Sequence, residues 1–101
     1  MVNSNPYLFI VDIIPMPENE FYENITGAKA HIWVISNDKE NAKLRAINYT
    51  QKFLWEITSF EYEFEIREEQ IPKLHEDELR LYQSALHHGI AADFLAYPKV
   101  M

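Results

Sequence analysis

Residues 60–67 read FEYEFEIR, and this segment is the clearest indication of the fold class. Its even-numbered positions are all apolar, and its odd-numbered positions are all charged. The apolar residues are Phe60, Tyr62, Phe64 and Ile66, and the charged residues are Glu61, Glu63, Glu65 and Arg67. Strict alternation is typical of a β-strand that buries one face and exposes the other. We therefore expect a strand whose polar face carries three glutamates in a row.

Three other segments have the composition of strands. Residues 7–14 (YLFIVDII) are rich in β-branched and aromatic residues and lie between Pro6 and Pro15. Residues 29–36 (KAHIWVIS) form a second such segment, and residues 93–97 (DFLAY) form a short last one that Pro98 closes. Apart from Asp12, the segment 7–14 is apolar on both faces, and strands of this kind are usually covered on both sides.

Two segments have helical character. The first runs from Asn37 to about Trp55, with Asn37 placed to cap it and Glu40 three residues further on, as in a variant of the capping box. The second runs over residues 76–88, begins with three acidic residues and is followed by Gly89, which is suited to ending a helix.

The predicted order is strand, strand, helix, strand, helix, strand, and a length of 101 residues fits one domain spanning residues 1–101. The simplest arrangement is an α+β two-layer sandwich, with two helices on one face of a four-stranded, mainly antiparallel or mixed sheet. This architecture is broadly ferredoxin-like, although the order of elements is not the standard one. The likeness is one of architecture and carries no function.

The composition excludes several classes of function. There are 16 acidic and 9 basic residues, and a formal net charge of −7 disfavours binding to nucleic acid or to an anionic membrane. The charge fits solubility or a basic partner protein. The apolar run at residues 7–14 is too short to span a membrane, and we expect a cytoplasmic protein. The absence of cysteine excludes disulfides, thiolate nucleophiles and zinc fingers.

No motif for a cofactor, a metal or a nucleophile stands out. Two isolated glycines cannot form a phosphate-binding loop, and no serine lies in a Gly-x-Ser-x-Gly turn. The histidines do not have the spacing of a metal site; they are His31, His75, His87 and His88. We therefore expect no cofactor and no metal.

Asp12 and His31 are weak candidates for acid–base chemistry. If their strands pair, the carboxylate and the imidazole lie on one face of the sheet and could act as a general base. The alternative is a buried polar pair, or an aspartate at a sheet edge that discourages aggregation.

The row Glu61, Glu63 and Glu65 has two interpretations. It could be an acidic docking face for a basic protein. It could also be a solvated strand face with one ion pair to a neighbouring strand, for which Lys29 and His31 are the available partners.

The sequence also contains more apolar strand surface than two helices on one side of a sheet can cover. The residues left over are Leu8, Ile10, Ile14, Trp33 and Ile35 on the strands, with Leu44 and Trp55 off the main helix stripe. Exposed apolar patches of this kind mark interfaces, and a symmetric homodimer is the commonest solution. The alternatives are that residues 16–28 fold over this face, or that Trp55 belongs to the following strand.

These observations lead to three hypotheses of function. The first is a non-enzymatic protein-interaction module that acts as a homodimer through its uncovered sheet face. The second is an acidic inhibitor, similar to an immunity protein or antitoxin, of a basic partner protein. The third is a small enzyme that uses Asp12 and His31.

Overall fold

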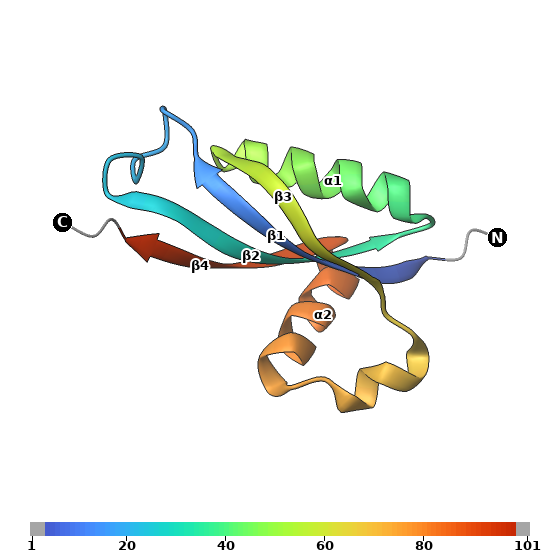
Figure 1. Cartoon of the computed structure of the whole chain (residues 1–101). Coiled ribbons are helices and arrows are strands. Elements are labelled where there is room, and N and C mark those ends of the chain that lie inside the picture. Colours follow the sequence, from blue (N-terminus) through green and yellow to red (C-terminus); the bar gives the residue numbers. More distant parts are fainter. Residues whose placement is uncertain (1–3, 99–101) are drawn as a thin grey trace.

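The computed structural model of the chain describes residues 4–98, which form one four-stranded sheet and two α-helices (Figure 1). The elements in chain order are β1 (Asn5–Pro15), β2 (Ile25–Ser36), α1 (Lys39–Lys52), β3 (Trp55–Glu65), the 3₁₀ helix η1 (Glu68–Lys73), α2 (Glu76–His88) and β4 (Ile90–Pro98). The predicted order of strands and helices is therefore confirmed. Among these described residues, no helix is long and apolar enough to cross a membrane.

The sheet has the strand order β3-β1-β2-β4, and all three pairings are antiparallel. The long β1 and β2 strands form the centre, and β3 and β4 are the two edges. In the β1–β2 ladder Phe9 lies opposite Ile32 and Leu8 lies opposite Trp33, so each of these pairs belongs to one face of the sheet.

The two helices cover opposite faces of the sheet (Figure 1), so the predicted two-layer arrangement with both helices on one face is wrong. The strand order β3-β1-β2-β4 does not confirm the expected ferredoxin-like architecture. On the first side, called the α1 face, Ala42 and Ala46 of α1 pack against Phe9, Val11 and Ile32. On the other side, called the α2 face, Ala85 of α2 packs against Leu8 and Trp33. Because β1 is apolar on both of its faces, each face requires its own cover, and one helix supplies each.

The strand β3 does not keep one apolar face along its length. Phe60 lies opposite Val11 and Tyr62 lies opposite Ile10, which leaves Glu61 as an extra residue at a bulge. Phe60 therefore lies on the α1 face, where its ring meets that of Phe9 at 5.8 Å, whereas Tyr62 lies on the α2 face. The prediction of one buried face from Phe60 to Ile66 is wrong because the bulge exchanges the two faces.

The boundaries of α1 also differ from those predicted. Asp38, and not Asn37, caps the helix by accepting a hydrogen bond from the backbone N–H of Asn41 at 2.6 Å. The helix ends at Lys52, Leu54 adopts a left-handed backbone conformation with a φ of 66°, and Trp55 begins β3. A turn of this kind commonly ends a helix, because left-handed backbone cannot continue it.

Candidate interaction surfaces

The predicted apolar interface is covered by the chain's own second helix. Leu8 is 5% exposed and Trp33 is fully buried beneath α2, η1 and their flanking residues. Ile10 and Ile35 are half-buried and pack against the same cluster. These four side chains are therefore covered, fully or in part, by α2 and its flanking residues. They do not form the exposed sheet-face interface that the sequence predicted. Helix α2, rather than residues 16–28, supplies the cover.

The three other predicted interface residues lie apart from one another. Trp55 is buried in the core of the α1 face. Ile14 is exposed on the α2 face near the end of β1, and Leu44 is exposed on α1. These three side chains do not form one patch.

Asp12 and His31 lie on the same face of the sheet, as the sequence predicted, but the Asp12 carboxylate interacts with Ser59 and Lys29 and not with His31. Its Oδ2 accepts a hydrogen bond from Ser59 Oγ at 2.8 Å, and its Oδ1 lies 3.7 Å from the Nζ of Lys29, the residue opposite it on β2. His31 lies opposite Ile10 on β1 and opposite Asp93 on β4. Within residues 4–98 no hydrogen bond joins His31 to Asp12, so the carboxylate does not orient the imidazole as a catalytic pair requires.

The bulge in β3 also separates Glu61 from Glu63 and Glu65, which both lie on the α1 face. Glu61 pairs with Lys29 on the α2 face, and the hydrogen bond between them raises the pKa of the Lys29 ammonium group. Glu63 pairs with α1 on the opposite face, at 3.3 Å from Lys39 and 3.2 Å from Lys43. The expectation of one continuous acidic face is therefore wrong. Of the two partners that the sequence offered, Lys29 and His31, the structure pairs Lys29 with Glu61.

Metal ligands do not gather in the part of the chain that the structure describes. No group of three or more histidine, aspartate or glutamate side chains there is arranged to hold a metal ion.

The edge strand β4 is the feature that the sequence did not reveal. Its nine residues read IAADFLAYP, and Asp93 is the one charged residue among them. On the α2 face, beyond the part that α2 covers, Leu95 is 68% exposed and Tyr97 is 45% exposed. The sequence indicated only residues 93–97 as a strand and could not show that this strand forms an edge. Long apolar edges are uncommon in soluble proteins, because their free backbone groups pair readily with another strand.

The alternation of hydrogen bonds identifies which backbone groups of β4 point outward. The carbonyl of Gly89 accepts a hydrogen bond from the N–H of Ile35 at 2.9 Å, immediately before the ladder in which Val34 lies opposite Ile90. In an antiparallel ladder the residues that bond to the neighbouring strand alternate with those that point away from it. The N–H and C=O groups of Ala92, Phe94 and Ala96 therefore face away from β2.

The opposite edge of the sheet is protected. Strand β3 carries four glutamates, and its pairing with β1 is irregular at two places. Charges and bulges of this kind are the usual means by which a sheet edge avoids pairing. The two edges of the sheet thus differ, and β4 is the one suited to accept another strand.

Comparison with protein-family models, with curated proteins and with solved structures finds no match to this chain, so the geometry of β4 and of the surfaces around it is the basis for the proposals that follow.

Proposed function

We propose that this protein is a non-enzymatic interaction module that acts as a homodimer, in which two copies associate through their β4 edges. The observation that carries the proposal is the contrast between the two sheet edges: β3 is bulged and acidic, whereas β4 is long, apolar and open. Strand addition to such an edge gains backbone hydrogen bonds along its whole length. The proposed dimer interface is therefore the β4 edge, and not the sheet face predicted from the sequence, which α2 covers.

A second copy is the occupant that the β4 sequence favours. An antiparallel pair centred on Phe94 brings Phe94 opposite its own counterpart and Ala92 opposite Ala96, so every outward-facing residue meets another outward-facing residue. In this register Asp93 lies opposite Leu95, and the two aspartates do not lie directly opposite each other. The arrangement is isologous, as a two-fold dimer requires.

Side chains on both faces would contribute to the same pairing. On the α1 face the two Phe94 rings would form a cross-strand aromatic pair, a favourable combination in sheets. On the α2 face the exposed Leu95 and Tyr97 of each copy would lie over the partner strand. The dimer would form one eight-stranded sheet.

The test is the substitution Ala96→Pro, with Ala96→Val as its matched control. Proline removes the outward N–H of Ala96 but leaves the β2–β4 ladder intact, because that N–H does not point toward β2. Valine keeps the N–H and suits a strand. Sedimentation velocity at tens of micromolar should show a dimer for the wild type and for Ala96→Val. The dissociation constant of Ala96→Pro should rise at least about tenfold, since each dimer loses two backbone hydrogen bonds.

Circular dichroism of the three proteins checks that each is folded. Hydrogen exchange gives a second measure, because the amides of Ala92, Phe94 and Ala96 should exchange more slowly as the protein concentration rises. A wild-type protein that stays monomeric at these concentrations contradicts the proposal. So does an Ala96→Pro variant that associates as strongly as the wild type.

A further inference from the structure

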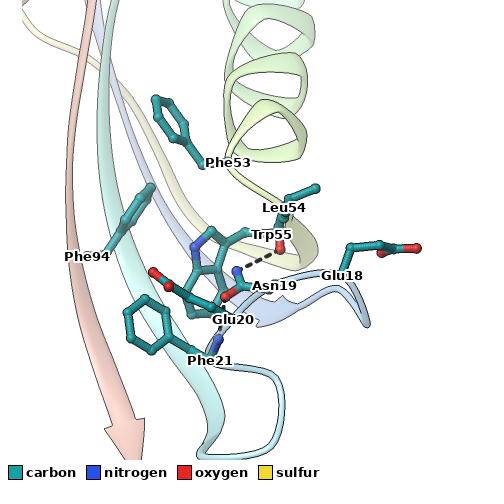
Figure 2. Close-up of a pocket in the computed structure, with 8 residues that line it drawn as sticks. All are labelled: Glu18, Asn19, Glu20, Phe21, Phe53, Leu54, Trp55 and Phe94. Atoms are coloured by element: carbon teal, nitrogen blue, oxygen red, sulfur yellow. Dashed lines mark hydrogen bonds between the residues drawn. The ribbon is translucent and has the colours of Figure 1, made fainter.

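An open hollow lies at the end of α1, on the α1 face, and the side chain of Phe94 from β4 forms part of its wall. It measures about 440 Å³, within the range of small-molecule pockets of about 300–1,000 Å³. Four aromatic side chains line it: Phe21, Phe53, Trp55 and Phe94 (Figure 2). They come from the turn after β1, the end of α1, the start of β3 and the middle of β4. The site is therefore assembled by the fold and not by a single segment of the chain.

The buried side chain of Asn19 holds two walls of the hollow together. Its Nδ2 donates a hydrogen bond to the carbonyl of Leu54 at 2.9 Å, and its Oδ1 accepts one from the N–H of Phe21 at 2.8 Å (Figure 2). The N–H of Met16 donates to the same Leu54 carbonyl at 2.9 Å. Asn19 is only 7% exposed, and a buried amide with both ends bonded is rigid. The hollow is therefore formed before any ligand arrives.

The four aromatic rings differ in how far they are exposed. Trp55 is largely buried at the base, with its ring centroid 6.1 Å from that of Phe94. Phe21 and Phe53 are about half-exposed at the sides. Aromatic rings around one hollow attract a cation through their quadrupoles and can also bury its alkyl groups.

The charges of the lining point to the same class of ligand. The residues around the hollow include the carboxylates Glu18 and Glu20 and no lysine, arginine or histidine. Figure 2 shows the carboxylate of Glu20 turned toward the rings, whereas that of Glu18 points away from them. An anion would be repelled here, and a neutral apolar ligand would gain nothing from Glu20.

We propose that this hollow binds a small quaternary ammonium compound, with its methyl groups against the four aromatic rings and its positive charge beside Glu20. A methylated ammonium group suits the site better than a primary amine, because it is weakly hydrated and its methyl groups can be buried on apolar walls. Phe94 is also at the centre of the proposed β4 pair, but one copy supplies all four rings, so the site does not require the homodimer.

Choline and its uncharged carbon analogue 3,3-dimethylbutan-1-ol are the probes for this proposal. They have nearly the same shape and differ in charge. Titration followed by ¹H–¹⁵N NMR should show choline shifting the indole N–H of Trp55 and the amide of Phe21, with an affinity at least about tenfold above that of the neutral analogue, as a desolvated cation–π contact predicts. The indole of Trp33, on the opposite face of the sheet, should not move.

Two substitutions with the same change of net charge make the test specific. Glu20→Gln should weaken choline binding by about three- to fivefold, as expected for a partly exposed charge contact, and Glu18→Gln should change it little. Phe53→Ala removes an exposed ring and should abolish detectable binding without unfolding the protein. Equal affinity for choline and the neutral analogue, or equal effects of the two glutamine substitutions, would overturn the proposal.

Repeating the titration in Ala96→Pro separates this proposal from the proposed homodimer. Binding should persist in that variant, because one copy supplies all four rings and Ala96 does not line the hollow. Loss of choline binding in Ala96→Pro with a folded monomer would show that the site needs a second copy, which contradicts the independent site proposed here.

Discussion

At the scale of single residues, Trp33 shows that a side chain predicted to lie at an interface can belong to the core instead. Tryptophan in a surplus apolar patch indicates a binding hot spot, but here the ring lies under α2 with its centroid 5.9 Å from that of Tyr82. Its Nε1 has no hydrogen-bond partner among the described residues, an arrangement tolerated because the ring fills the core between β2 and α2.

We expect Trp33→Ala to lower the free energy of unfolding by about 3–5 kcal/mol, because it leaves a large cavity in a fully buried position. Denaturant unfolding measures this loss. The control Leu44→Ala, at an exposed position on α1, should cost less than about 0.5 kcal/mol. If Trp33→Ala fails to fold, Trp33→Phe keeps a ring and should fold with a smaller loss. A cost below about 1 kcal/mol for Trp33→Ala would contradict its place in the core.

At the scale of elements, the bulge in β3 gives neighbouring glutamates different partners. Burial raises the pKa of the Glu63 carboxyl, but hydrogen bonds and charge interactions with Lys43 and Lys39 outweigh burial and hold this pKa below its ordinary 4.5. A carboxyl whose pKa is lowered by folding stabilises the protein above its unfolded-state pKa. That contribution is lost as the pH falls through the folded-state value.

We expect Glu63→Gln to lower the free energy of unfolding at neutral pH by up to about 1 kcal/mol, the size of a partly exposed ion pair. The difference from the wild type should shrink toward zero well below pH 4.5, because both side chains are then uncharged. Urea unfolding at the two pH values measures it. Glu65→Gln is the matched control, since Glu65 forms no ion pair within residues 4–98 and its replacement should cost less at neutral pH than that of Glu63. A pH-independent cost at Glu63 would exclude the ion pairs with α1 as its cause.

At the scale of the whole molecule, charge distinguishes a homodimer from a complex with a basic protein. Each copy carries a formal net charge of −7, so two copies repel each other at long range. Raising the ionic strength from about 0.01 M to 0.15 M shortens the screening length from about 30 Å to about 8 Å. The dissociation constant of the homodimer, measured by sedimentation equilibrium, should therefore fall as salt is added. Self-association that weakens with salt would indicate that attraction between charges, and not pairing of apolar β4 edges, holds the copies together.

Local patterns in the sequence were sufficient for the kinds of element and their order. The alternation at residues 60–67, the acidic start of residues 76–88 and the position of Gly89 each reflect contacts within a few residues, and α2 spans the predicted range. The two-sided apolar character of residues 7–14 also indicated correctly that β1 is covered on both faces.

The face that each helix covers, the bulge at Glu61 and the position of β4 at an edge all depend on contacts between residues far apart in the chain. The hollow around Asn19 depends on such contacts too, since it joins four separate segments. A helix or strand of given periodicity can pack on either side of a sheet, and one extra residue in a strand exchanges its faces without changing the local pattern. The side on which each helix packs is the one that lets both faces of β1 be buried at once. This is a property of the assembled fold.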